Sequence, residues 1–332
     1  MLDERKASIL RAVVEEYIQT AQPVGSGHVA KAPGIDVSSA TVRNEMAALE
    51  GDGYLTQPHT SAGRIPTEKG YREFVDALAE PSLDRTAQQQ VRSFFDQAHG
   101  EIERMLADTT RLLAGLTDYA AVVVGPPHEA AKVRAVQLVS LAPTVALFVA
   151  VLGNGAVEKR TIDLPVECDE AVLAQAAQHL SGALVGQPLA ASASVASAEP
   201  PPVQAVVAAV RAALATGLAD DADHVFVDGT SRMAASFEAV ETVRSVLTIL
   251  EQQLVVVTLL RDVVDRGLNV AIGSETGMVP LAECALVVAP YTVDGEQVGT
   301  VGVLGPSRMN YPQALAAVAV VGQRLGHRLS EG

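Results

Sequence analysis

Residues 38–67 read SSATVRNEMAALEGDGYLTQPHTSAGRIPT, and this stretch decides how the rest of the chain is interpreted. Within it Val42, Met46 and Leu49 recur four and three residues apart, which places an apolar stripe on one face of a helix. Ser38 is a suitable N-cap, because a serine hydroxyl accepts a hydrogen bond from the backbone N–H groups of the first turn. The stretch therefore opens with a short amphipathic helix.

The opposite face of this helix is small, polar and once basic, since it carries Ala40, Arg43, Asn44 and Ala47. An arginine offers guanine two hydrogen-bond donors, and an asparagine amide matches the edge of adenine. A face of this chemistry suits a helix that lies in the major groove of DNA and reaches base edges.

A two-stranded wing is predicted directly after the helix. Two glycines end the helix, and strands are expected at 54–56 and 64–67 on either side of a proline- and glycine-containing turn. A helix over 3–20 and a short one over 26–31 precede the stretch. The order helix, turn, helix, wing is the one expected of a winged helix-turn-helix. An amphipathic core helix followed by a hairpin accounts for the periodicity equally well.

The sequence of these segments favours the first interpretation. SSATVRNEMAALE (38–50) and PHTSAGRIPTEKGYREFVD (58–76) closely resemble the N-terminal winged helix of the HrcA family, the heat-inducible transcription repressors of bacteria. Near the other end, GTVGVLGPSRMNY (299–311) resembles the same family, whereas the middle of the chain matches poorly. Gly27 stands where family members usually carry a basic residue, which weakens the case for DNA contact by the second helix.

The pattern and the resemblance together predict an α+β, multidomain chain. Its expected parts are a winged helix-turn-helix DNA-binding domain (1–80), a long linker helix (81–116), a GAF-like α/β sandwich (117–165 and 223–332) and an inserted, mainly helical dimerisation domain (166–222). All β-rich runs between 120 and 164 are assigned to the GAF-like sheet, and the apolar run 254–260 also reads as a strand. Residues 189–202, rich in small residues and proline, read as a flexible loop.

Apolar and small residues alternate by four and three along the predicted linker helix. They are Val91, Phe95, Ala98, Ile102, Met105, Thr109 and Leu112. Such a heptad seam either pairs with its copy in a second chain or packs on its own domain. The sequence leaves both arrangements open.

The charge of the chain argues against nucleic-acid binding if it is taken as a whole. The 332 residues carry a net charge of −15, and the first 80 hold eight Lys and Arg against twelve Asp and Glu. DNA affinity must then come from a local patch. The side chains expected to contact DNA are Ser39, Thr41, Arg43, Asn44, His59, Thr60, Ser61, Arg64, Lys69 and Arg72.

The family resemblance also implies partners. It implies that a homodimer binds double-stranded DNA at an inverted-repeat operator upstream of chaperonin and Hsp70 operons. It further implies that the chaperonin GroEL acts as a folding modulator that supports the active fold of the repressor.

Other function classes find little support in the sequence. The two cysteines stand alone and the seven histidines are scattered, so no metal site, cofactor or catalytic residue is expected. No apolar run reaches the roughly 18 residues of a membrane span, and the N-terminus lacks the shape of a signal peptide, which indicates a cytoplasmic protein without a membrane partner. The alternative function is a metabolite-responsive regulator with a small-molecule site in the GAF-like domain. An enzyme with a winged-helix appendage would need a cluster of titratable residues, and the sequence shows none.

Overall fold

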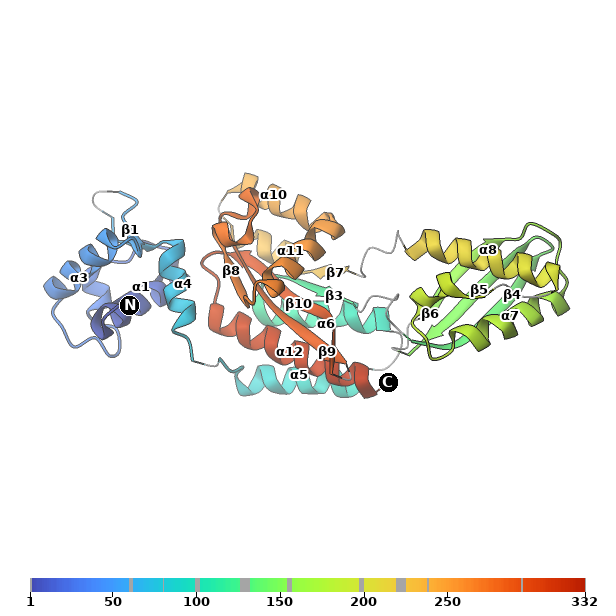
Figure 1. Cartoon of the computed structure of the whole chain (residues 1–332). Helices are drawn as coiled ribbons and strands as arrows, with labels where there is room; N and C mark the ends of the chain where they lie inside the picture. The colour runs from blue at the N-terminus through green and yellow to red at the C-terminus, as the bar shows by residue number, and fades with distance from the viewer. Residues whose placement is uncertain are drawn as a thin grey trace.

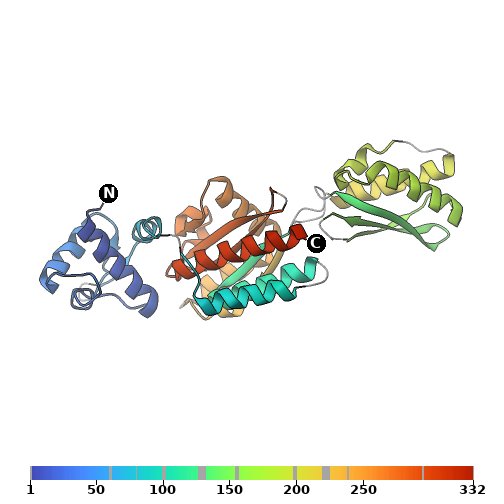
Figure 2. The ribbon, with the colours of Figure 1, turned by 90° about the horizontal axis from the view of Figure 1, so that it is seen from below.

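The computed structural model describes residues 2–331 except 60–61, 80, 99–101, 126–131, 154–156, 197–199, 219–224, 238 and 294. The chain is mixed α/β and elongated, with three units arranged one after another (Figures 1 and 2). We call them the N-terminal unit (2–79), the central unit (81–125 and 225–331) and the outer unit (132–218).

The N-terminal unit packs four helices and a short antiparallel hairpin around one apolar core. Its elements are α1 (Glu4–Thr20), α2 (Ser26–Val29), α3 (Ser39–Gly51), β1 (Leu55–Thr56), β2 (Ile65–Pro66) and α4 (Glu68–Asp76). Helix α1 is capped at its start by Asp3, whose carboxylate accepts the Lys6 N–H at 2.8 Å, and at its end by Ala21 in the left-handed conformation. The expected order of helices followed by a two-stranded hairpin is therefore present, and α4 leads toward the central unit.

The central unit is a five-stranded antiparallel sheet with helices on both faces. The strand order is β7-β3-β10-β9-β8, formed by β3 (Ala120–Val124), β7 (Val225–Asp228), β8 (Val270–Ile272), β9 (Cys284–Val293) and β10 (Glu296–Pro306). The covering helices are α6 (Ile102–Thr117) and α12 (Tyr311–Glu331) on one face and α9 (Thr230–Ala234), α10 (Val240–Glu251) and α11 (Gln253–Asp265) on the other. Because both faces are covered, a strand such as β3 is apolar at every position.

The expected linker helix is two helices, and it packs on its own unit. Helix α5 (Arg85–Gln97) ends before α6 begins, and the buried Val91 and Phe95 of α5 belong to the same apolar core as α12. The Arg328 guanidinium of α12 donates to the Ala98 carbonyl at 2.8 Å. The heptad seam therefore faces the central unit, and Figure 2 shows α5 running beside α12.

The outer unit is an independent body with its own sheet and core, which contradicts the expected domain boundaries. Its elements are β4 (Val133–Ala142), β5 (Val145–Leu152), β6 (Val157–Asp163), α7 (Glu170–Leu184), the 3-10 helix η2 (Leu189–Ser194) and α8 (Pro201–Leu218). The assignment of these three strands to the central sheet was wrong. The expected insert, 166–222, is helical where the structure describes it, but its helices form one unit with these strands. Alternate residues of β5 are fully buried, as in a sheet covered on one face only, whereas the central strand β3 is buried throughout.

Two smaller expectations were also wrong. The apolar run 254–260 lies in helix α11, because a continuous apolar run fits a buried helix as well as a strand. Part of the expected flexible loop forms η2, whose Leu189 is fully buried. Within the described ranges no single helix is long and apolar enough to cross a membrane, although α10 and α11, bent by 93°, pass that test as a pair.

Candidate nucleic-acid interface

Helix α3 is capped and oriented as its sequence indicates. The Ser38 hydroxyl accepts the Thr41 N–H at 3.2 Å and lies 3.0 Å from the Thr41 hydroxyl, so the Thr41 side chain is engaged in the cap. Val42, Met46 and Leu49 are fully buried against the other helices of the N-terminal unit. This burial fixes which face of α3 looks outward.

The outward face of α3 is open and carries one cation. Ser39, Ala40, Arg43, Asn44 and Ala47 are all exposed, in agreement with the helical periodicity. Within the part of the chain that the structure describes, the side chains of Arg43 and Asn44 have no hydrogen-bond or ion-pair partner. In Figure 1, α3 lies at the end of the molecule remote from the central unit, so no other unit covers this face.

The acidic residues near α3 are balanced by cations, which limits the repulsion that the net charge suggests. Three carboxylates on α3 and the turn after it each lie beside a cation. The pairs are Arg5–Glu45 at 3.5 Å, Lys6–Asp52 at 3.3 Å and Arg64–Glu50 at 2.9 Å. The two more exposed pairs, Arg5–Glu45 and Lys6–Asp52, add little stability, but all three pairs leave Arg43 as the charge on the outward face of the helix.

The β1–β2 hairpin is tied to the body of the N-terminal unit through Arg64. Its backbone N–H and C=O both pair with Val24 at 2.9 Å. Its side chain is only 16% exposed, and its guanidinium reaches Glu50 at the end of α3. Gly63 permits this approach, since a Cβ there would lie 2.4 Å from the Val24 oxygen. Of the other expected wing residues, His59 is exposed, while Thr60 and Ser61 lie outside the described residues.

Lys69 joins the first turn of α4 to the end of α3. Its Nζ donates to the Asp52 carbonyl at 2.7 Å and lies 4.2 Å from the centre of the Tyr54 ring. The side chain remains exposed on the wing side of the unit. Lys69 is therefore a neighbour of the α3 surface, but it points back onto its own domain.

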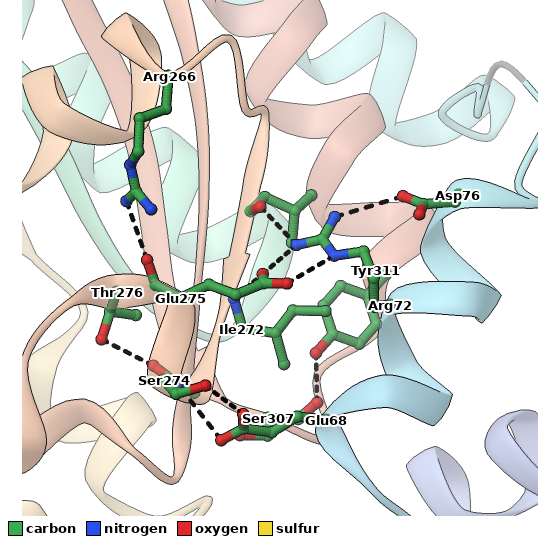
Figure 3. Close-up of polar contacts among 12 residues, drawn as sticks. Glu68, Arg72, Asp76, Arg266, Ile272, Ser274, Glu275, Thr276, Ser307 and Tyr311 are labelled. Atoms are coloured by element: carbon green, nitrogen blue, oxygen red, sulfur yellow. Dashed lines mark hydrogen bonds and ion pairs between the residues drawn. The ribbon is translucent and has the colours of Figure 1, made fainter. Parts of the chain in front are cut away.

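The position of Arg72 contradicts its expected contact with DNA, because its side chain faces the central unit and does not lie beside the outward face of α3. Its Nε donates to a Glu275 carboxylate oxygen at 3.0 Å, and Nη2 donates to the other Glu275 oxygen and to the Val270 carbonyl, the latter at 2.8 Å (Figure 3). Burial alone would lower the pKa of Arg72, but the hydrogen bonds and charge of Glu275 raise it. Arg72 is a contact between two units, and we remove it from the DNA-contact set.

Comparison with known proteins identifies the family. Residues 103–315 match the model described as HrcA protein C terminal domain. The chain is 38% identical to the heat-inducible transcription repressor HrcA of Acidothermus cellulolyticus, covering 100% of both chains. It is also 38% identical to that of Rhodococcus jostii, covering 99% of both. The chain belongs to the HrcA family of heat-inducible transcription repressors.

A solved structure supports the fold of this HrcA-family chain. The crystal structure of a hypothetical protein at 2.2 Å resolution matches with a TM-score of 0.71 and 24% identity, covering 100% of this chain and 99% of that one. At this identity the likeness concerns the fold alone. It shows that the mixed α/β arrangement of the whole HrcA-family chain recurs in a solved protein.

The described residues offer little for other chemistry. They contain no group of three or more His, Cys, Asp or Glu side chains arranged to hold a metal ion. Cys284 is fully buried, and burial raises the pKa of its thiol to about 12, which opposes nucleophilic reactivity. The hollows of the central unit include an open, solvent-facing one of about 860 Å³ beside Tyr291 and His327 and a smaller one of about 140 Å³ between Val124 and Leu260. Only the smaller one falls below the roughly 300–1,000 Å³ of typical small-molecule sites.

Several residues that shape this interface escaped the sequence analysis. Arg5 and Lys6 of α1 neutralise carboxylates near α3, and Glu275 holds Arg72 across 203 positions of sequence. No local pattern marks such partners, because ion pairs between distant segments depend on the tertiary fold. Only the excess of acidic residues in the N-terminal unit hinted that some of them must be neutralised.

Proposed function

We propose that this HrcA-family repressor acts by binding duplex DNA through the outward face of α3. In this proposal the N-terminal unit is a winged helix-turn-helix, and the central unit is a GAF-like sandwich that carries it. The observation that supports it most strongly is the division of α3 into a fully buried apolar face and an open face with Arg43 and Asn44. A helix of this kind fits the major groove with its N-terminal half toward the bases.

The residues of the open face take different roles in this proposal. Arg43 and Asn44 contact base edges, because their side chains carry the donors and acceptors that distinguish guanine and adenine. Ser39, exposed beside them in the first turn, is placed to contact phosphate or a base edge. Thr41 supports the N-cap of α3. Lys69 and the exposed His59 lie on the wing side of α3, at the edge of the DNA groove that the helix would enter.

We also propose that the protein is a homodimer whose contact is the open face of the β4-β5-β6 sheet. One face of β5 is formed by the fully buried Ala146, Phe148, Ala150 and Leu152, which pack on α7 and α8. The other face is also apolar. The large side chains most exposed on it are Val139 at 45%, Leu141 at 56%, Val151 at 36% and Val157 at 37%.

This face favours a second copy of the chain over solvent. In register, Val139 lies opposite Leu147 and Val151 opposite Val157, so the apolar positions join β4 to β5 and reach the start of β6. Further along β6 the same face carries the polar residues Lys159, Thr161 and Asp163. A contiguous apolar face on a sheet is an interaction site, and a twofold partner covers it with an identical face. The sequence suggested the helices of the outer unit as the dimer contact. Their apolar faces instead pack in the core of the outer unit, where Leu180 and Val210 are fully buried.

The architecture of the central sheet supports a proposed dependence on the chaperonin. Strand β3 pairs with β7 in the register Ala121↔Asp228 and with β10 in the register Val301↔Val123, so the central sheet closes only after distant segments meet. Long-range pairing is slow, and apolar surface stays exposed meanwhile. We propose that the chaperonin GroEL binds such intermediates, and that the operator is an inverted repeat upstream of chaperonin and Hsp70 operons.

The experiment that tests this function measures binding of the full chain to three duplexes. These are the inverted repeat, a single half-site and a scrambled sequence of equal length. The proposal expects two chains per inverted repeat, weaker binding to one half-site, and about 10³-fold or greater preference for the repeat over the scrambled duplex at physiological salt. Equal affinity for all three duplexes would refute sequence-specific repression by this chain.

A further inference from the structure

Helix α4 meets the central unit through a contact that is polar at two ends. At one end Arg72 forms its two-pronged pair with Glu275, supported by the Asp76 carboxylate at 3.4 Å. At the other end the Glu68 carboxylate accepts the Ser274 N–H at 3.0 Å and the Ser274 hydroxyl at 2.5 Å. Figure 3 shows both ends converging on the short helix η3 (Gly273–Thr276). We call these residues, with the aromatic ones below, the α4 contact.

The centre of the α4 contact is aromatic and almost dry. Tyr71 and Phe74 of α4 are each 4% exposed, and Tyr311 at the start of α12 is fully buried. The Tyr311 ring centre lies 5.8 Å from that of Tyr71 and 6.5 Å from that of Phe74, in tilted and edge-on geometries that favour attraction. An aromatic centre between two charged ends resembles the energetic core of a specific interface.

The central unit presents its half of the contact in a fixed shape. Glu275 is oriented by the Ile272 N–H at 2.9 Å, and its backbone carbonyl accepts the Arg266 guanidinium at 2.9 Å. Gly273 has φ +53, and a Cβ there would lie 2.0 Å from a Glu68 carboxylate oxygen. The glycine thus leaves room for Glu68 to seat directly on η3. Such a preformed receptor loses little entropy when α4 docks.

Without this contact the N-terminal unit would be held by a tether. Only eight residues, 77–84, separate the end of α4 from the start of α5, and a connection of that kind permits rotation. Domains within one chain move relative to one another unless an interface restrains them. A two-pronged Arg–carboxylate pair restrains angle as well as distance, because both of its hydrogen bonds must be kept at once.

We propose that the α4 contact determines operator specificity by fixing the angle at which each recognition helix leaves its central unit. This inference rests on the proposed function, in which two N-terminal units of a dimer meet two half-sites. A spacer longer by two base pairs turns one half-site by about 70° about the DNA axis, since one turn holds about 10.5 base pairs. A rigid contact rejects such a spacer, whereas a tethered unit follows it.

The test compares binding of the full chain to duplexes with different spacers between the same half-sites. The affinity of the wild type for the duplex with its best spacer should exceed its affinity for spacers two base pairs longer or shorter by a factor of about ten or more. In the double variant Glu275→Gln/Ser274→Ala this factor should fall to about three or less. Both proteins should bind a single half-site within about twofold of each other. The matched control is Glu251→Gln, which removes an exposed carboxylate of the central unit far along α10.

The outcomes separate the two proposals. If the wild type fails to bind the half-site above a scrambled duplex, the proposed function fails. If half-site binding is normal but the variant keeps the spacer preference of the wild type, the α4 contact has no role in specificity. A wild type that accepts all spacers equally overturns the inference as well.

A DNA-independent measurement checks the same point. Spin labels at Gln19→Cys and Leu254→Cys, both exposed, report the distance between the N-terminal and central units in a chain carrying Cys168→Ser and Cys284→Ala. We expect a narrow distance distribution, broadened by Glu275→Gln/Ser274→Ala while circular dichroism stays unchanged. An equally narrow distribution in the double variant would contradict a restraining role for these residues.

Discussion

The Arg64 guanidinium lies 2.9 Å from the Glu50 carboxylate, and this pair joins the β1–β2 hairpin, the proposed wing, to the end of α3. The pair is part-buried, and the Arg64 backbone is also bridged to Val24 on both sides. Arg64 therefore supports the wing from within. The sequence predicts that Arg64 touches DNA directly. Its contacts with Glu50 and Val24 instead hold the β1–β2 hairpin in position.

Arg64→Ala should loosen the wing and lower the free energy of unfolding by about 1 kcal/mol, since part-buried charged hydrogen bonds contribute on that order. Operator and random duplex should lose affinity by similar factors, because a displaced wing affects phosphate contacts at every sequence. Urea unfolding and titrations on both duplexes measure these effects. The control is Arg92→Ala, an exposed arginine on α5. Unchanged stability together with a loss confined to the operator would contradict the positioning role.

The open sheet face of the outer unit gives a prediction about assembly. Leu141→Glu, at a position 56% exposed on β4, should raise the dimer dissociation constant by about a hundredfold or more, because it places a charge in an apolar contact. Val279→Glu, 89% exposed on the central unit, should leave the dimer intact. Sedimentation velocity across a concentration series distinguishes the two. An intact dimer in Leu141→Glu would move the contact elsewhere.

Chaperonin dependence predicts an outcome for refolding. Chain diluted from denaturant should recover little operator binding alone and several times more with chaperonin and ATP, because the central sheet needs long-range pairing before its apolar strands are covered. The measured quantity is operator binding per mole of dimer that remains in solution. Native protein given the same chaperonin should gain nothing. Full spontaneous recovery at stress temperature would exclude the chaperonin as a folding modulator.

Buried tyrosines at the α4 contact predict a loss of stability in alkali. Burial raises the pKa of Tyr71, and burial likewise raises that of Tyr311, above the ordinary value of 10.0. Their neutral forms are favoured in the folded state, so their contribution is complete below pH 10 and falls as the pH rises further. Urea unfolding between pH 8 and 11 should show this decline. Tyr71→Phe should make the decline shallower, and an identical slope in the variant would contradict the assignment.

The sequence predicted the local structure of the N-terminal unit well, because helix periodicity alone separates the buried Met46 from the exposed Arg43. It failed where the answer depends on partners remote in sequence. Strands β4 to β6 were assigned to the wrong sheet, because the sequence of an apolar strand does not indicate which strand it pairs with. The sequence predicted Arg72 as a DNA contact because cations are common beside the wing of such domains. Its partner Glu275 could not be predicted, because it lies 203 positions further along the chain.

The measurement that tests the central claim most directly is the base specificity of Arg43→Ala. Wild type, Arg43→Ala and the control Arg92→Ala are titrated with the operator, with single base-pair substitutions in one half-site, and with random duplex. Arg43→Ala should cost about 1–3 kcal/mol on the operator and lose discrimination at one base pair, with a smaller loss on random duplex. Arg92→Ala should behave as the wild type does. If Arg43→Ala instead weakens operator and random duplex equally and keeps every base preference, α3 does not read the operator through Arg43.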